Sequence, residues 1–263
     1  MIEKQVLLTG SSRGIGKAIA LQLAEKGCRI ALHHHQDDIE NAREVLKEVQ
    51  EKGGSGLLFA ADLNDPQNAI ALGNQVWEKL GKVDFLINNA GVSYKKHFLD
   101  ASIADIDYFM NINFKSTLLL TQTIARKMVE DAIEGSIYTI TSINGIQPGV
   151  GQSIYGATKG AVEVLMKGIA LELAPHRIKV NTIAAGSIQT DMNKAVWMDS
   201  EKLQLVNDHV PLGRMGQVSE IANTIVSLLY TGSYMTGSTI IIDGGWMMNQ
   251  GFNKPKPYNN TPS

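Results

Sequence analysis

The chain has 263 residues, of which 44% are hydrophobic and 19% charged, and this suits one large globular domain with a sizeable core. Its formal net charge of −2 gives no electrostatic reason to expect nucleic acid or an anionic membrane as a partner. The single cysteine, Cys28, excludes an internal disulfide. The first apolar run, Val6–Leu8, is too short for a secretory signal, and no stretch reaches the length of a membrane span. We therefore expect a soluble cytoplasmic protein.

Short apolar runs, which predict buried strands, alternate with amphipathic stretches, which predict helices. The predicted strands are 6–9, 29–33, 57–61, 83–87, 136–141, 179–183 and 239–242. The predicted helices are 17–26, 37–52, 66–80, 102–130, 154–174 and 218–230. This order predicts an α/β fold, a single-domain doubly wound parallel sheet (Rossmann fold) with helices on both faces. We expect the domain to cover residues 1–250, followed by a polar tail, residues 251–263, with three prolines.

A glycine-rich turn lies between the first predicted strand and the first predicted helix. Its sequence is Thr9-Gly10-Ser11-Ser12-Arg13-Gly14-Ile15-Gly16. Because glycine lacks a Cβ atom, such a turn can be tight and its backbone can approach a pyrophosphate. The N-terminus of the next helix adds free N–H groups and partial positive charge. Glycines alone fit an ordinary turn equally well, but their place between a buried strand and a helix favours a dinucleotide cofactor.

Tyr155 and Lys159 form a second chemical feature, because their spacing places them one turn apart on one face of a predicted helix. Hydride transfer to a carbonyl requires a proton for the nascent alkoxide oxygen, and a tyrosine can deliver it. A nearby ammonium lowers the pKa of a tyrosine. Moving that pKa from ~10 to ~7 requires roughly 4 kcal/mol of differential stabilisation. The spacing alone also fits a surface pair on an amphipathic helix.

In combination and in order, the motifs resemble those of the short-chain dehydrogenase/reductase family. They are the glycine turn, Asn88-Asn89-Ala90-Gly91 after the fourth strand, Ser142 after the fifth strand, and the Tyr155/Lys159 pair. The resemblance extends from about Val6 to Gly245, nearly the whole chain. It implies a nicotinamide-dependent oxidoreductase that interconverts a carbonyl and a secondary alcohol by hydride transfer.

The resemblance implies four catalytic residues. Tyr155 is the implied acid/base, Ser142 the hydrogen-bond partner of the substrate oxygen, and Lys159 the residue that binds the nicotinamide ribose and tunes the tyrosine. Asn113 is implied to hold a proton-relay water near the lysine. Its alternative role is structural, to satisfy backbone groups near its long helix.

The resemblance also implies a set of cofactor contacts. Asp62 and Leu63 match the pair beside the adenine, and Asn89 matches a ribose-side contact. Ile188 and Thr190 match the segment that holds the carboxamide. The full implied set is Gly10, Ser12, Arg13, Ile15, Gly16, His34, His35, Asp62, Leu63, Asn89, Gly91, Tyr155, Lys159, Ile188 and Thr190.

NADP(H) is the expected cofactor, with NAD(H) as the alternative. The position that matches the ribose-binding acid of NAD enzymes is His34, followed by His35, so no acid there repels a 2′-phosphate. Arg13 matches a basic residue that NADP-dependent members use for this phosphate, and a guanidinium fits a phosphate in a bidentate way. The acids Asp37 and Asp38 favour NAD(H) unless they only cap the next helix.

The substrate cleft is expected between residues after Ser142, the loop after Asn89 and a lid from Ile188 to about Val210. One expected substrate is a free small molecule, such as a sugar, polyol or ketone. The lid segment 186–193 is similar to that of bacterial glucose dehydrogenases, which supports this class. The alternative is a 3-oxoacyl-carrier-protein reductase, which much of the chain also resembles.

Charge favours the small molecule over the acidic carrier protein. Arg126 and Lys127 are followed by Glu130, Asp131 and Glu134, and an acidic docking face repels an acidic partner. Leu171 stands where carrier-protein reductases have a second arginine. A non-catalytic sensor or scaffold is a third class, and the retained serine, tyrosine and lysine argue against it.

Two further expectations concern metals and assembly. The run His33–His35 does not predict a metal site, because neighbours in a strand point to opposite faces. The family resemblance implies a homotetramer built by pairing the two long helices, and the apolar content of 118–124 and 161–173 allows it.

Overall fold

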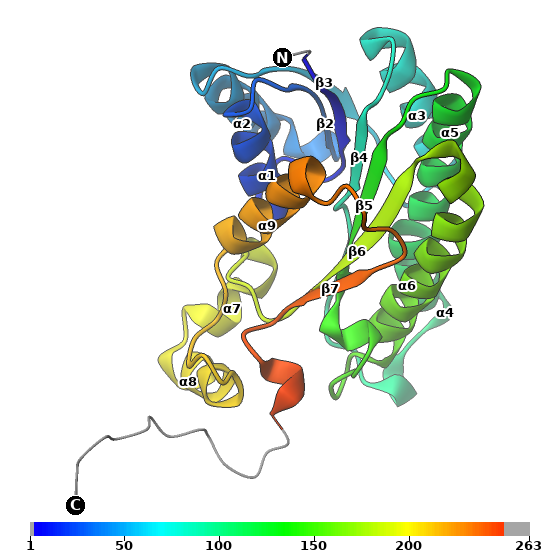
Figure 1. Ribbon diagram of the computed structural model, residues 1–263. Helices are drawn as coiled ribbons and strands as arrows, with labels where there is room; N and C mark the ends of the chain where they lie inside the picture. Colours follow the sequence, from blue (N-terminus) through cyan, green and yellow to red (C-terminus); the bar gives the residue numbers. More distant parts are fainter. Residues whose placement is uncertain (1–2, 250–263) are drawn as a thin grey trace, which may run out of the picture.

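A seven-stranded parallel sheet forms the centre of the computed structural model, which describes residues 3–249 (Figure 1). The strand order is β3-β2-β1-β4-β5-β6-β7, with every pairing parallel. The predicted doubly wound sheet is therefore confirmed, whereas the predicted tail lies outside the described residues. The strands are β1 Gln5–Leu8, β2 Arg29–His34, β3 Ser55–Ala60, β4 Phe85–Asn88, β5 Ser136–Ser142, β6 Lys179–Ala185 and β7 Thr239–Ile242.

Helices cover both faces of the sheet, as the side-chain alternation of the strands requires. Val6 and Leu8 of β1 pack into one apolar cluster, and Leu7 between them packs into the other. The first cluster is closed by α1 Gly14–Ala24, α2 Ile39–Glu51 and α9 Val218–Thr231. The second is closed by α3 Pro66–Leu80, α5 Thr117–Glu130 and α6 Ser153–Leu173 (Figure 1).

The predicted helix start at Asp65 is confirmed, since its carboxylate accepts a hydrogen bond from the Gln67 N–H at 3.0 Å and Pro66 follows. The predicted helix 102–130 is interrupted. It consists of α4 Ile103–Phe109, the π-helical segment η3 Met110–Ser116, and α5. Such π segments often occur at functional sites, and this one contains Asn113.

Two helices that the sequence did not predict lie inside the expected lid, α7 Lys194–Trp197 and α8 Ser200–His209. Asp199 caps α8 by accepting from the N–H groups of Glu201 and Lys202, both at 3.1 Å. Neither helix contains a buried residue, so neither shows strong apolar periodicity. No helix among residues 3–249 is long and apolar enough to cross a membrane.

The direction of the strand order reverses between β1 and β4, which are neighbours in the sheet. A crevice for ligands forms at such a point, beyond the carboxyl ends of the strands. The Thr9 N–H, just after β1, donates to the carbonyl oxygen of Ile87 in β4 at 3.1 Å. The glycine turn and the segment Asn88–Gly91 therefore lie side by side at this crevice.

Candidate active site

The glycine turn is folded tightly and is held by the segment after β4. Gly10 and Gly14 have φ angles of 62° and 54°, a region that favours glycine. A Cβ atom on Gly16 would collide with the carbonyl oxygen of Gly10. The Asn89 amide donates to the carbonyl oxygens of Thr9 and Gly10, both at 2.9 Å. Asn89 therefore braces the turn, and the ribose contact implied for it stays a prediction.

The predicted adenine-side residues lie at the ends of β2 and β3. His35 is exposed, and its Nε2 lies 3.9 Å from Asp62 Oδ1. Leu63 is buried, and its carbonyl oxygen accepts a hydrogen bond from Ser116 Oγ at 2.7 Å. His34 is only 1% exposed. The structure thus brings His35, Asp62 and Leu63 to one edge of the crevice, whereas the surface of His34 faces protein.

A carboxylate stands beside the residue predicted to bind a 2′-phosphate. The Arg13 side chain is 65% exposed, and its Nε lies 3.8 Å from Asp38 Oδ2. The same oxygen accepts a hydrogen bond from Ser12 Oγ at 2.7 Å. Burial alone would raise the pKa of Asp38, but hydrogen bonds from Ser12 and Asn41 and the charge of Arg13 lower it. Asp38 stands at the N-cap position of α2, but its side chain makes no cap bond to the backbone of that helix.

Three predicted catalytic side chains meet where β5 ends beside the start of α6. Ser142 is the last residue of β5, and its hydroxyl is hydrogen-bonded to Tyr155 and accepts from the Asn144 N–H at 3.1 Å. Lys159 Nζ lies 6.0 Å from the centroid of the Tyr155 ring. It donates to the carbonyl oxygen of Ile140 at 3.0 Å. Serine, tyrosine and lysine are therefore adjacent, as predicted.

Close backbone contact between α6 and the turn after β5 makes this arrangement possible. A Cβ atom on Gly160 would lie 2.7 Å from the carbonyl oxygen of Gly145. A Cβ atom on Gly156 would collide with the carbonyl oxygen of Asn144. Since real Cβ atoms do not approach so closely, these glycines bring the turn with Ser142 against the helix with Tyr155.

The side-chain amide of Asn113 is hydrogen-bonded to other residues of the protein. Its Oδ1 accepts from the Val92 N–H at 2.9 Å, and its Nδ2 donates to the Val92 carbonyl oxygen at 3.0 Å and to Thr158 Oγ1 at 3.2 Å. A Cβ atom on Gly91 would lie 3.2 Å from both Asn113 Oδ1 and Lys159 Nζ. Gly91 thus lets these two polar groups approach each other. A relay water near the lysine stays a prediction.

Burial dominates the protonation of the predicted catalytic pair, Tyr155 and Lys159. It raises the pKa of Tyr155, and only the hydrogen bond with Ser142 opposes this rise. Burial also lowers the pKa of Lys159 to about 8. The expectation that the lysine ammonium lowers the tyrosine pKa is therefore not met in the protein chain by itself.

The lid lies close to the glycine turn and is held by hydrogen bonds between its own residues. A Cβ atom on Gly14 would lie 3.7 Å from Thr190 Cγ2. Trp197 Nε1 donates to the Thr190 carbonyl oxygen at 2.9 Å, and Asn193 Nδ2 donates to that of Ile188 at 2.7 Å. The predicted carboxamide segment, Ile188 and Thr190, thus lies beside the turn predicted for the pyrophosphate.

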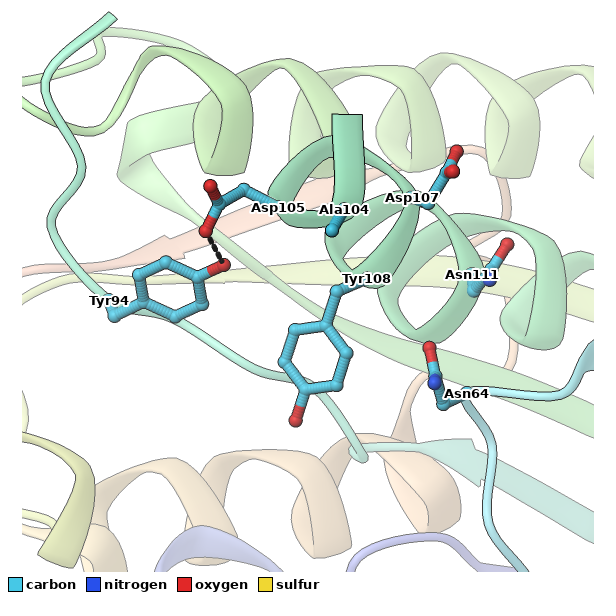
Figure 2. A pocket seen from close by; sticks show the side chains of 7 residues that line it. All are labelled: Asn64, Tyr94, Ala104, Asp105, Asp107, Tyr108 and Asn111. Carbon is cyan, nitrogen blue, oxygen red and sulfur yellow. Dashed lines mark hydrogen bonds between the residues drawn. The ribbon is translucent and has the colours of Figure 1, made fainter. Parts of the chain in front are cut away.

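The loop after Asn89 is braced by a stack of aromatic rings. The Tyr94 ring stacks on Phe109 with centroids 4.5 Å apart, and Phe109 lies 6.3 Å from the ring of Tyr155. Figure 2 shows the Tyr94 hydroxyl pointing to Asp105, to which it donates at 2.8 Å. Tyr94 and Asp105 border an open hollow of about 500 Å³ beside α4, which none of the predicted catalytic residues line.

The loop that carries Tyr94 also contacts the loop before α6. The Lys96 N–H donates to the carbonyl oxygen of Gly151 at 3.0 Å. The two predicted walls of the cleft, after Asn89 and after Ser142, are therefore joined.

Comparisons with known proteins identify the family of this chain. A family model described as Enoyl-(Acyl carrier protein) reductase matches residues 10–247. An L-rhamnose 1-dehydrogenase (NAD(P)(+)) of Azotobacter vinelandii is 34% identical over 252 residues, which cover 95% of this chain and 98% of that one. The chain belongs to the short-chain dehydrogenase/reductase family. It is therefore an oxidoreductase that interconverts carbonyl and alcohol groups of small molecules with NAD(P).

Solved structures of short-chain dehydrogenases share the fold over nearly the whole chain. Acetoin dehydrogenase from Enterobacter cloacae is 37% identical with a TM-score of 0.87, covering 97% of this chain and 99% of that one. A short chain dehydrogenase from Burkholderia cenocepacia, solved in complex with NADP, is 30% identical with a TM-score of 0.85, covering 93% and 98%.

The residues present fit the nicotinamide cofactor that this family uses. The cradle formed by Gly10, Gly14 and Gly16 has no Cβ atom in the way of a pyrophosphate. Lys159 and Tyr155 lie at the carboxyl end of β5, beside the same crevice. Among residues 3–249, no three His, Cys, Asp or Glu side chains are grouped as a metal site requires.

Sequence reasoning missed several residues that support this short-chain dehydrogenase site. Thr9 Oγ1 accepts from the N–H groups of Asn89 and Ala90, at 2.9 and 3.0 Å. Thr158 accepts from Asn113, as described above. No local pattern signals such bonds, because their partners are 45 to 81 positions apart in the chain.

Proposed function

We propose that this protein is an NADP(H)-preferring oxidoreductase of a free sugar, polyol or ketone, with Tyr155 as the acid/base. The observation that carries the proposal is the junction of β5 and α6, where Ser142, Tyr155 and Lys159 lie together. The relatives support the substrate class, since their names specify a sugar and a hydroxyketone.

The residues have separate roles in the proposed reduction. When bound, the reduced nicotinamide supplies a hydride to the substrate carbonyl carbon. Tyr155 transfers its hydroxyl proton to the nascent alkoxide oxygen, and Ser142 donates a hydrogen bond to that oxygen. Lys159 binds the nicotinamide ribose, and its Nζ lies 6.0 Å from the centroid of the Tyr155 ring. In the direction of oxidation, the tyrosinate accepts the proton of the alcohol.

Proton resupply to Tyr155 is assigned to Lys159 and Asn113. The lysine ammonium holds protons near the tyrosine, and Asn113 keeps the segment after β4 against α6. We propose that a water between them relays protons to solvent, as the family resemblance implies.

The preference for NADP(H) rests on Arg13 and on the histidine at the end of β2. The guanidinium is largely exposed beside the crevice, and no acid occupies position 34. Asp38 tempers this preference, because its carboxylate lies 3.8 Å from the guanidinium and would repel a 2′-phosphate. We therefore propose that NADP(H) is preferred and that NAD(H) is also used.

Charge on α5 and α6 supports a free small molecule over the carrier protein. Leu171 is 79% exposed at the position where a second arginine would stand. Glu130, Asp131 and Glu134 are exposed at the end of α5. Such a face offers little attraction to an acidic partner.

The test is NADPH oxidation with two classes of substrate. We expect turnover with hydroxyketones or sugar-derived ketones and negligible turnover with a 3-oxoacyl group on a carrier protein. The opposite pattern would show that the carrier-protein reductase is the correct alternative. Failure of every carbonyl with NADPH binding intact would favour the non-catalytic sensor or scaffold.

We further propose a cytoplasmic homotetramer. Two apolar side chains on the outer side of α6, Val164 and Leu171, are 71% and 79% exposed, and Ile103 on α4 is 79% exposed. Burial of such surface against a second copy of the chain would stabilise an assembly.

A further inference from the structure

His33 is a buried histidine that lies under the glycine turn, and the proposed chemistry does not use it. It is the fifth residue of β2 and only 3% exposed. The Gly10 N–H donates to its Nδ1 at 3.1 Å, and its Nε2 lies 3.1 Å from the carbonyl oxygen of Ala61. Its own carbonyl oxygen accepts from the N–H and the hydroxyl of Ser11, at 2.9 and 3.0 Å.

The chemistry of the two ring partners fixes the tautomer. A backbone N–H can only donate, so Nδ1 must present its lone pair to Gly10. A carbonyl oxygen can only accept, so Nε2 must carry the proton that Ala61 receives. Only the neutral ring protonated at Nε2 satisfies both partners. If the ring were protonated at Nδ1, its N–H would point at the backbone N–H of Gly10, and no hydrogen bond could form there.

The two partners of the ring belong to two separate parts of the proposed cofactor site. Gly10 begins the turn proposed for the pyrophosphate, and Ala61 directly precedes Asp62 and Leu63 on the adenine side. The distance between these segments along the chain is about fifty residues, yet one imidazole bonds to both. A rigid imidazole thus sets the spacing of the turn from the adenine side.

We propose that His33 is a positioning residue for the nicotinamide cofactor. Its Nε2-protonated ring holds the glycine turn to the segment 61–63. The inference rests on the proposed cofactor contacts and goes beyond them, because His33 itself touches no cofactor. Its loss should weaken binding of the adenosine and pyrophosphate half and leave the catalytic group at β5 and α6 unchanged.

Three variants separate positioning from mere packing. His33→Leu fills the space but leaves the Gly10 N–H and the Ala61 carbonyl oxygen without partners. His33→Asn offers its Oδ1 where Nδ1 stands, so it restores an acceptor for Gly10. His33→Gln offers its Nε2 amide where the ring Nε2–H stands, so it restores a donor to Ala61. The readout is the Kd of NADPH and of NADH by nicotinamide fluorescence, which needs no substrate.

We expect His33→Leu to raise the Kd of both cofactors about tenfold and by the same factor, because the ring bonds to Gly10 and Ala61 and not to Arg13. His33→Asn should bring the Kd back to within about threefold of the wild type. Equal losses for Leu and Asn, or a wild-type Kd for Leu, would overturn the proposal. A wild type that binds neither cofactor would instead overturn the proposed function.

A measurement on the wild type tests the tautomer of His33 directly. The ¹⁵N shifts of the imidazole nitrogens, assigned by comparison with His33→Asn, report the tautomer at neutral pH. We expect Nε2 protonated and Nδ1 unprotonated, both before and after NADPH is added. A ring protonated at Nδ1 would contradict the proposal.

Discussion

At the scale of single residues, Tyr155 and Lys159 stand one turn apart on α6, and desolvation shifts the pKa of each toward its neutral form. The sequence predicted their proximity but not this balance, since burial depends on α5, β5 and the loops that cover the pair. A catalytic lysine that is 6% exposed is held at a cost in folding free energy.

Lys159→Met should therefore stabilise the fold while it abolishes function. Between a folded-state pKa of about 8 and the ordinary value of 10.5, the unfolded chain binds more protons, so the free energy of unfolding rises with pH across this window. Below about pH 8 the burial cost is present in full, about 3 kcal/mol. The methionine variant also loses the hydrogen bond to the Ile140 carbonyl oxygen, and this offsets about 1 kcal/mol of its gain in stability.

Denaturant unfolding at pH 7 and pH 10.5 measures this difference. We expect the methionine variant to be about 2 kcal/mol more stable at pH 7, with the gain gone at pH 10.5. A variant less stable than the wild type at pH 7 would show that the ammonium is well solvated or paired.

Arg13 and Asp38 should act in opposite directions on cofactor choice. Arg13→Ala should raise the Michaelis constant for NADPH about 10- to 100-fold with little change for NADH, because it removes a charged partner of the 2′-phosphate. Asp38→Asn should lower the constant for NADPH a few-fold, since it removes a repulsive carboxylate 3.8 Å from the guanidinium. Steady-state kinetics with both cofactors measures these ratios. Equal effects of Arg13→Ala on the two cofactors would refute the phosphate assignment.

At the scale of elements, the contact between α6 and the turn after β5 sets the position of Ser142 relative to Tyr155. Gly160 makes this contact with Gly145, whereas Gly168, two turns further along the same helix, faces open space. Gly160 and Gly168 therefore provide a test position and a control position in one helix.

Gly160→Ala should lower the turnover number at least tenfold, because the new methyl group must push the turn and Ser142 away from α6. It should also destabilise the fold by about 1–3 kcal/mol. Gly168→Ala should leave turnover unchanged, because its new methyl group meets no atom within 4 Å in the chain. Paired kinetics and thermal unfolding test this. Similar turnover in the two variants would show that the contact does not position the serine.

Prediction from the sequence succeeded for elements with strong local signals. The strand 239–242 and the cap at Asp65 lie where predicted. It failed for η3, because apolar periodicity predicts a helix there but does not distinguish a π-helical segment from an α-helix. It also failed for α8, which has no buried residue, although Asp199 before it was a usable cap signal.

At the scale of the whole molecule, the parallel order of strands explains how much of the site the sequence revealed. Motifs directly after strands must meet at one edge of the sheet, and the glycine turn, Gly91 and Ser142 follow β1, β4 and β5 in this way. Contacts between side chains from distant segments were not predictable. The bond from Gly10 to His33 and the bond from Ser12 to Asp38 both depend on the finished fold.

The proposed assembly is also a property of the whole molecule. If the exposed apolar side chains of α6 pair between copies, Val164→Glu together with Leu171→Glu should convert a tetramer into a smaller species, because it sets like charges against each other. Size-exclusion chromatography with light scattering gives the mass of each form. A monomeric wild type would contradict the assembly, and an unchanged mass in the variant would place the interface elsewhere.

The central claim is that Tyr155 transfers the proton in a nicotinamide-dependent reduction of a small carbonyl compound. The most direct test compares NADPH oxidation by the wild type and Tyr155→Phe with a hydroxyketone, alongside the Kd of NADPH for each. We predict a loss of turnover of about 10²- to 10⁴-fold in the variant, with its NADPH affinity within a few-fold of the wild type. Turnover retained at the wild-type rate would contradict the claim.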